Sequence, residues 1–331
     1  MDAKITKQRL SQMLSYDWLK IILSIAAGIL VWSLVFTTTA TRIKPSQSFG
    51  IFNYLGSSVS TKFNDYADQP QLFSYEVLEV SAQDLNVSGD QYAFQIMEAR
   101  LATDEADVMF VANIDGGYLE YMENGETKKA TYLEDFLYRY YAYAYRLDDA
   151  DGQKGYLTQM KEYLNGYYNG DYTNANGLDA QKVESDFRAR AKQNKDKRYK
   201  TEEKIQQGVQ DDIQRIQSYR QSLVDFYEYL DKGYIQLTQE TLHFTDNNGQ
   251  PHDITGYFSI NLCPNEETMG ELKSEVYYRV TDEETEQTKS TALNMNLVVI
   301  NDVKTESGFE FERLGFVTQL VRKYCSELKT A

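Results

Sequence analysis

The chain has 331 residues, of which 42% are hydrophobic and 13% aromatic, so it is long enough to bury a sizeable core. Its formal net charge of −16 argues against nucleic acid as a partner, because phosphate contacts require Lys and Arg. The same acidity argues against an outer domain that lies flat on anionic lipid, and it favours a soluble domain in a salty exterior.

An uncharged apolar stretch near the N-terminus is the strongest signal in the sequence. No charged residue occurs from Ile21 to Phe36, and residues 18–40 together are long enough for a helix to cross about 30 Å of hydrocarbon. Basic residues are more frequent before this core than after it; they are Lys4, Lys7, Arg9 and Lys20 on one side and Arg42 and Lys44 on the other. By the positive-inside rule, residues 1–17 form a cytoplasmic leader, residues 18–40 span the cell membrane and the chain after them lies outside it.

The alternative to an uncleaved membrane anchor is a secretory signal peptide. Thr38 and Ala40 are small and fit a cleavage site, whereas the apolar stretch and the segment before it are long for such a peptide. No later stretch approaches this length, so we expect one membrane span.

The segment after the span begins an α/β lobe that we assign to residues 49–131. Residues 41–48 form a tether, in which Pro45 prevents the helix from continuing. Apolar alternation predicts one strand over Phe49–Leu55 and a second over Tyr75–Val80.

A helix and a third strand complete the first part of the lobe. Apolar residues recur at helical spacing from Asp90 to Leu101, and Ala106–Ala112 is a nearly continuous apolar run. Such a run is typical of a strand that is buried on both faces of a parallel sheet. We therefore expect a βαβ arrangement, with a loop over Asn113–Gly117 at the carboxyl end of the third strand, where open α/β sheets place ligands.

The middle region, residues 132–235, is expected to be helical. Tyr132–Arg146 is rich in tyrosine, and helical spacing would place Tyr138, Tyr141 and Tyr145 on one face. This face suits core packing, a partner surface or a ligand platform. An apolar stripe within Asp179–Asp231 predicts one amphipathic helix or two helices in a hairpin.

The final region, residues 236–331, completes the lobe. An Asn-Gly turn between Leu237–Asp246 and His252–Ile260 predicts a β-hairpin. A further strand is expected over Leu293–Asn301 and a closing helix over Phe309–Leu328.

Motifs for catalysis or metal binding do not occur in the sequence. It contains no nucleophile elbow, P-loop, HExxH or CxxC, and its two histidines are His243 and His252. Its two cysteines, Cys263 and Cys325, are too few for a disulfide framework, although an isolated bridge stays open. We therefore expect no enzyme, no catalytic residues, no metal and no cofactor.

Several segments, taken in order, resemble the extracellular solute-binding proteins of bacterial ABC importers, the carbohydrate-type group with the type II periplasmic-binding fold. The segments are Phe49–Tyr54, Tyr75–Val80, Gln95–Val111, Tyr132–Phe136, Gly256–Leu262, Leu293–Asn301 and the last helix. Two departures stand out: no lipobox cysteine follows the span, and the middle region shows few strand signals where that family has a second lobe.

The resemblance implies an α/β lobe with a large helical insertion and a non-catalytic, solute-binding-like function. A small polar solute such as a sugar and an ABC importer permease are the partners that it implies. The family's geometry would place a ligand at the loops after the first and third strands, at Asn53, Tyr54, Gly56, Ser57, Asn113, Ile114 and Asp115. The alternative is a membrane-anchored protein-interaction or scaffold module of the cell envelope that has no small-molecule ligand. A pocket at this edge would favour solute binding, and a filled edge would favour interaction.

Overall fold

The computed structural model describes residues 7–39, 43, 47–68, 73–88, 90–123, 126–194, 196–245, 250–281, 286–301 and 308–329. The chain divides into two compact units, Met1–Ile43 and Lys44–Ala331. Most of the expected tether, residues 41–48, lies outside the described residues, as does most of the expected Asn-Gly turn of the hairpin.

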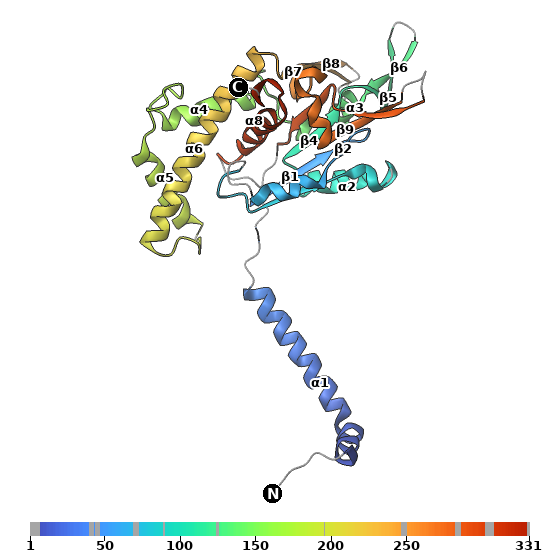
Figure 1. Cartoon of the computed structure of the whole chain (residues 1–331), viewed down its shortest axis with the longest axis vertical. Coiled ribbons are helices and arrows are strands. Elements are labelled where there is room, and N and C mark those ends of the chain that lie inside the picture. The colour runs from blue at the N-terminus through green and yellow to red at the C-terminus, as the bar shows by residue number, and fades with distance from the viewer. Residues whose placement is uncertain are drawn as a thin grey trace. The chain divides into compact units, whose positions relative to one another are not determined.

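The first unit is one helix, α1 (Lys7–Thr39) (Figure 1). Its segment Trp18–Thr37 is 20 residues long and apolar enough to cross a membrane by length and composition. At 1.5 Å per residue such a segment spans about 30 Å, the thickness of a bilayer's hydrocarbon core. Its large apolar side chains, such as Trp32, are exposed within the chain.

The second unit contains a mixed six-stranded sheet with the order β3-β1-β4-β11-β8-β7 (Figure 1). The strands are β1 (Ser48–Asn53), β3 (Glu79–Gln83), β4 (Val108–Ala112), β7 (Gln236–Thr245), β8 (Pro251–Asn261) and β11 (Met295–Val299). Strand β1 is parallel to β3 and β4, whereas β11 is antiparallel to β4 and to β8. The unit is therefore mixed α/β, as expected.

Helices cover both faces of this sheet. The helices and 3₁₀ turns of the unit are η2 (Thr61–Asp68), η3 (Leu85–Ser88), α2 (Asp90–Ala102), α3 (Tyr132–Tyr140), η4 (Tyr141–Tyr143), α4 (Tyr156–Tyr167), α5 (Ala180–Gln193), α6 (Glu202–Asp231), α7 (Glu266–Met269), η5 (Gly270–Ser274), α8 (Glu312–Tyr324) and η6 (Glu327–Lys329). Successive side chains of a strand point to opposite faces, so Val108 and Phe110 of β4 join a core with α4, α6 and α8. Met109 and Val111 join a second core with α2 and α3. The prediction that this strand is buried on both faces is confirmed.

Two smaller sheets flank the main one. A three-stranded sheet has the order β10-β9-β2, and a separate hairpin pairs β5 with β6. Their bounds are β2 (Ser58–Val59), β5 (Asp115–Glu123), β6 (Glu126–Thr131), β9 (Val276–Thr281) and β10 (Thr288–Thr291). The β5–β6 hairpin was not predicted, and it replaces most of the loop expected over Asn113–Gly117.

The second predicted strand is displaced along the chain. The prediction was Tyr75–Val80, whereas β3 begins at Glu79. The Val77 amide donates a hydrogen bond to the Ser74 carbonyl at 3.2 Å, which closes a turn. The Tyr75 hydroxyl donates to Asp212 of α6 at 3.1 Å, so this residue belongs to the contact with the helical region.

The tyrosine-rich stretch does not form one helix. Helix α3 ends at Tyr140, and after the short turn η4 the residue Ala144 forms an antiparallel bridge with Ile300. The shared helical face expected for Tyr138, Tyr141 and Tyr145 is therefore wrong. The chain leaves the helix because its backbone pairs with the end of β11 instead.

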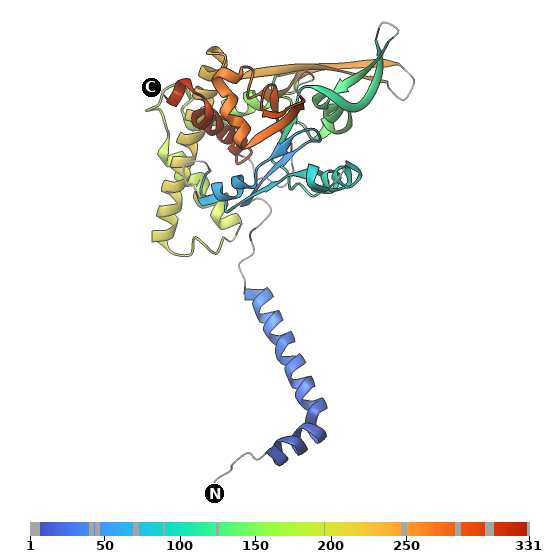
Figure 2. The same ribbon diagram turned by 45° about the vertical axis from the view of Figure 1, so that its right-hand side comes forward.

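The helical region beyond it contains α4, α5 and α6. The predicted apolar stripe lies within the single helix α6, and α5 precedes that helix along the chain. Figures 1 and 2 place α5 and α6 together at the end of the unit away from the β5–β6 hairpin. A buried ion pair lies within α6: the Nε of Arg215 donates to Asp212 at 2.7 Å, and both side chains are almost fully buried.

The C-terminal region matches its predicted order. The β7–β8 hairpin and the strand β11 are confirmed, and the closing helix is shorter than Phe309–Leu328, because it begins at Glu312 and ends at Tyr324. The two cysteines, Cys263 and Cys325, are free thiols and buried.

Candidate functional site

Of the residues expected to bind a ligand after β1, Asn53, Tyr54 and Ser57 are buried and form hydrogen bonds within the chain, whereas Gly56 is exposed. The side-chain amide of Asn53 donates to the Ser57 carbonyl and, at 3.1 Å, to Asp84, while its oxygen accepts from the Leu85 amide at 3.0 Å. The Ser57 hydroxyl donates to the Tyr54 carbonyl at 2.9 Å. These polar groups stabilise the loop itself.

Tyr54 is fully buried beneath this loop. Its hydroxyl donates to the buried carboxylate of Asp135 at 2.7 Å, and Arg139 donates to the same carboxylate at 3.1 Å. Burial and the neighbouring Asp135 raise the pKa of the Tyr54 hydroxyl. The tyrosine therefore anchors α3 to the end of β1.

The residues expected after β4 lie at the start of the β5–β6 hairpin. The Asn113 amide donates to the Asn294 carbonyl at 3.0 Å, and the Ile114 carbonyl accepts from the Tyr132 amide at 3.1 Å. Ile114 packs against the core and Asp115 is exposed at the first position of β5.

The ring of Tyr132 contacts both loops. A Cβ atom on Gly56 would lie 2.4 Å from this ring, and a Cβ atom on Gly116 would lie 2.9 Å from it. Both glycines have positive φ, 84° and 134°, which glycine adopts without strain. The structure thus brings the two expected loops together, with the Tyr132 ring occupying the space beside both of them.

A weakly acidic carboxyl group lies near the same edge. Burial raises the pKa of Glu240 on β7 to about 7, and the charge of Glu134 adds to this shift, while a hydrogen bond from the Asn113 side chain opposes it. Glu134 itself completes the capping box of α3 with Thr131. Glu240 is therefore partly protonated at neutral pH.

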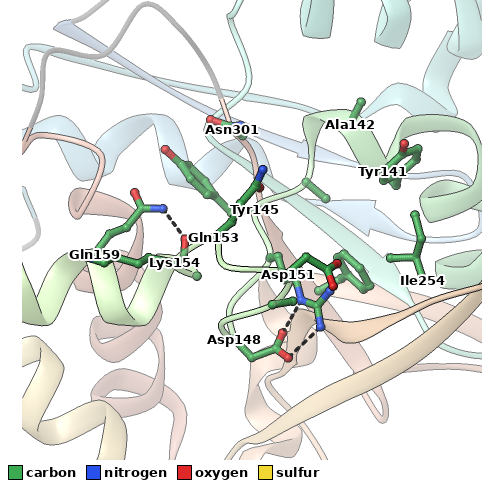
Figure 3. Close-up of a pocket in the computed structure, with 15 residues that line it drawn as sticks. Tyr141, Ala142, Tyr145, Asp148, Asp151, Gln153, Lys154, Gln159, Ile254 and Asn301 are labelled. Atoms are coloured by element: carbon green, nitrogen blue, oxygen red, sulfur yellow. Dashed lines mark hydrogen bonds and ion pairs between the residues drawn. The ribbon is translucent and has the colours of Figure 1, made fainter.

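A cavity of about 370 Å³ lies at the other end of the sheet (Figure 3). The Ile300 amide beside it donates to the Asp107 carbonyl just before β4, which marks the amino edge of the parallel strands. The lining residues come from the segment 141–159, from β8 and from the end of β11; they are Tyr141, Ala142, Ala144, Tyr145, Arg146, Asp148, Ala150, Asp151, Gln153, Lys154, Gly155, Gln159, Ile254, Phe258 and Asn301. None of the seven residues expected from the sequence is among them.

A tight turn shapes one wall of this cavity. Ala150 and Gln153 exchange two backbone hydrogen bonds, at 3.0 and 2.8 Å, across the residues Asp151 and Gly152. Both central residues have positive φ, 52° and 76°, as a two-residue turn of type I′ requires. The Asp-Gly pair is the sequence signal that could have located this turn.

The basic groups of the cavity are already paired. Arg146 forms two hydrogen bonds with Asp148, at 3.0 and 3.1 Å, and a third with the Thr255 carbonyl at 2.6 Å. The carboxylate of Asp148 also accepts from the Tyr257 amide, and its pKa is lowered by the bonds from Arg146 and Tyr257 against an opposing effect of burial. Lys154 pairs with Glu162 at 2.6 Å.

The polar and aromatic groups of the cavity define what it could contact. Within the described residues no group of three or more His, Cys, Asp or Glu side chains could hold a metal ion. The cavity offers tyrosine rings, amides and carboxylates, which are groups that recognise ligands by hydrogen bonds and ring contacts.

Comparison with known proteins does not assign the chain to a family. No protein-family model matches the chain, and no curated protein matches it.

Proposed function

We propose that the chain is a membrane-anchored, non-catalytic interaction module of the cell envelope. In this proposal the α/β unit is a solute-binding-like lobe whose ligand edge has been closed. The observation that carries it is the Tyr132 ring, which lies against both Gly56 and Gly116 where a solute would have to enter.

The hydrogen bonds of the same loops support closure. The polar atoms of Asn53, Tyr54 and Ser57 bond to the chain itself, and all three residues are at most 1% exposed. A solute would have to replace these bonds, and breaking buried hydrogen bonds costs about 1–3 kcal/mol for each group left unpaired. We therefore apply the resemblance to solute-binding proteins to the fold of the lobe and not to the binding of a solute.

The sheet order supports the solute-binding-like lobe in this proposal. The parallel set of β3, β1 and β4 is followed by the antiparallel return strand β11, which is the return of the chain to the first lobe that the resemblance implies. Helices α4–α6 stand where a second lobe would be expected.

Exposed aromatic residues beside the closed edge support interaction with a protein. Tyr118 on β5 is 46% exposed and Tyr92 on α2 is 64% exposed. The Tyr118 ring contacts Phe94 at 5.5 Å, and the guanidinium of Arg139 lies 5.1 Å from the Phe94 ring centre. Tyrosine and arginine are enriched at the centres of protein interfaces.

The orientation of the anchor is part of the proposal. By the positive-inside rule, the basic residues around the apolar helix support an N-terminus in the cytosol and an acidic unit on the outer side of the membrane. An ABC importer permease and other envelope proteins are candidate partners.

Site-specific photo-cross-linking in cells tests the proposal. A photoreactive phenylalanine replaces Tyr118 or Tyr92 in the full chain, and the matched control replaces Gln193, which is exposed on α5. We expect a discrete adduct from Tyr118 or Tyr92 and none from Gln193. Equal diffuse labelling at all three positions would contradict a specific interface here.

A solute screen on the full chain in nanodiscs tests the closed edge. Glycoside detergents are avoided because they would compete with sugars. A ligand at 100 times its dissociation constant stabilises a protein by about 2.7 kcal/mol, which for a domain of this size raises Tm by roughly 4–5 °C. We expect no such shift with mono- or disaccharides, and a shift that disappears in Asn53→Ala would overturn closure.

A further inference from the structure

We propose that the cavity beside the Asp151–Gly152 turn binds an alkylammonium group, either of a small polyamine or of a lysine side chain. This inference goes beyond the interaction function proposed above and does not depend on it. The cavity lies at the amino edge of the parallel strands, away from the closed edge at their carboxyl ends.

The balance of paired charges in the cavity favours a cation. Arg146 and Lys154 are the basic residues that line it, and both already have acidic partners in Asp148 and Glu162. For Asp151 the structure records no hydrogen bond or ion pair among the described residues, and its side chain is exposed. The carboxylate without a partner in the lining is thus the group that a ligand could neutralise.

An anion would find no comparable partner. The backbone amides at the start of α4 already have acceptors, because Gly155 donates to Asp149 at 2.8 Å and Tyr156 donates to the Arg146 carbonyl at 2.9 Å. The guanidinium of Arg146 is engaged by Asp148 on two nitrogens. With Asp148, Asp149 and Asp151 on one short loop, an incoming anion would also meet like charge.

Aromatic rings complete the recognition of an ammonium group. Tyr141 is 40% exposed and Tyr145 is half-buried, and both line the cavity (Figure 3). The face of a tyrosine ring attracts an ammonium ion, and aromatic side chains recognise ammonium ligands in this way. The cavity volume of about 370 Å³ is at the lower end of the range for ligand pockets, roughly 300–1,000 Å³, which suits a short alkyl chain.

The turn supplies a substitution that changes charge and preserves backbone. Asn-Gly, like Asp-Gly, is a preferred pair for a type I′ turn. Asp151→Asn therefore removes the negative charge while the turn keeps its geometry. Asp231→Asn is the matched control, because Asp231 is an exposed residue at the end of α6 and outside the cavity.

Calorimetric titration of the full chain in phosphatidylcholine nanodiscs tests the proposal; this neutral lipid avoids binding of amines to the membrane. The probes are spermidine and the peptide acetyl-Gly-Lys-Gly-amide, each compared with its N-acetylated, uncharged form. We expect at least one charged probe to bind, the acetylated forms to bind at least tenfold more weakly, and Asp151→Asn to weaken binding at least tenfold. Asp231→Asn should change the dissociation constant less than twofold.

The two probes distinguish the sources of the ammonium group. Binding of spermidine alone indicates a free amine, and binding of the peptide alone indicates a lysine of a partner protein. The proposal is overturned if neither probe binds, or if Asp151→Asn and Asp231→Asn bind equally well. It is also overturned if the acetylated probes bind as tightly as the charged ones. An unchanged Tm for Asp151→Asn shows that any loss of binding is not a loss of folding.

Discussion

Replacement of Arg215 by methionine tests how the helical region is fixed to the α/β lobe. Arg215 is 2% exposed, and its guanidinium donates to Asp212 at 2.7 Å, to the Gly308 carbonyl at 2.8 Å and to the Tyr163 hydroxyl at 2.9 Å. It also lies 4.3 Å from the ring centre of Phe309. These contacts join α6 to α4 and to the segment that leads into α8.

The expected cost follows from what the substitution leaves behind. Removal of one partner of a buried ion pair costs about 3–5 kcal/mol, because the remaining charge stays buried. Here Asp212 keeps a second partner, Arg190, at 3.1 Å, and methionine fills much of the volume. We therefore expect Arg215→Met to lower the free energy of unfolding by about 3 kcal/mol, at the low end of that range.

Urea denaturation of the full chain in nanodiscs, followed by circular dichroism, measures this loss. The control is Arg188→Met, which removes an exposed pair with Glu202 on neighbouring helices. Exposed ion pairs contribute little to stability, so the control should leave the midpoint unchanged within error. Equal effects of the two substitutions, or a loss below about 1 kcal/mol for Arg215→Met, would refute the account of a buried pair that fixes the two regions.

Three further predictions concern the closed edge and the buried thiols. Glu240 has a folded-state pKa of about 7, above its ordinary value of 4.5, so its stabilising effect is complete below pH 4.5 and is lost as pH rises through 7. Allowing for partial exposure, the free energy of unfolding of the wild type should fall by about 1–2 kcal/mol over this pH range, and Glu240→Gln should abolish that fall. Denaturation curves with the same pH dependence in both proteins would contradict this. Gly56→Ala should lower the Tm of the wild type more than it lowers the Tm of the Tyr132→Ala variant, because the new Cβ meets the Tyr132 ring. Additive losses of Tm would show that the ring does not fill this space. Cys263 and Cys325 should resist maleimide in the folded chain and react after denaturation, because both are buried and burial raises the pKa of Cys263 to about 12; rapid modification of the native protein, read by mass spectrometry, would contradict that burial.

Hydrophobic patterning located the elements that are buried on both faces or on alternate residues. The apolar run that contains β4 faces a core on each side, so continuous apolar residues were sufficient to identify it. The hairpin β7–β8 and the return strand β11 were likewise visible as alternation and as an apolar run.

Long-range contacts decided the places where patterning failed. Tyr75 was assigned to a strand by its neighbours, although its hydroxyl bonds to Asp212 far along the chain. The tyrosine-rich helix stops early because Ala144 pairs with Ile300, a contact that no local pattern contains.

The expected ligand loops illustrate the same limit at the candidate site. Spacing identified the ends of β1 and β4, and the structure brings these ends together around one ring. The spacing could not show that Tyr132, at the start of α3, would be that ring. The cavity at the opposite edge is formed by segments distant in sequence, and its local signals were the Asp151–Gly152 turn and the tyrosine-rich stretch that supplies Tyr141 and Tyr145.

Labelling of single introduced cysteines tests the central claim most directly, in cells whose cytoplasmic membrane is sealed and whose outer membrane, where there is one, has been removed. The natural cysteines are buried, so an impermeant maleimide reports on introduced sites, Gln193→Cys in the acidic unit and Lys7→Cys at the start of α1. An envelope module anchored by one span predicts that Gln193→Cys is labelled on intact cells and that Lys7→Cys is labelled only after lysis. Labelling of Lys7→Cys on intact cells, with Gln193→Cys protected until lysis, would contradict the proposed location and the function built on it.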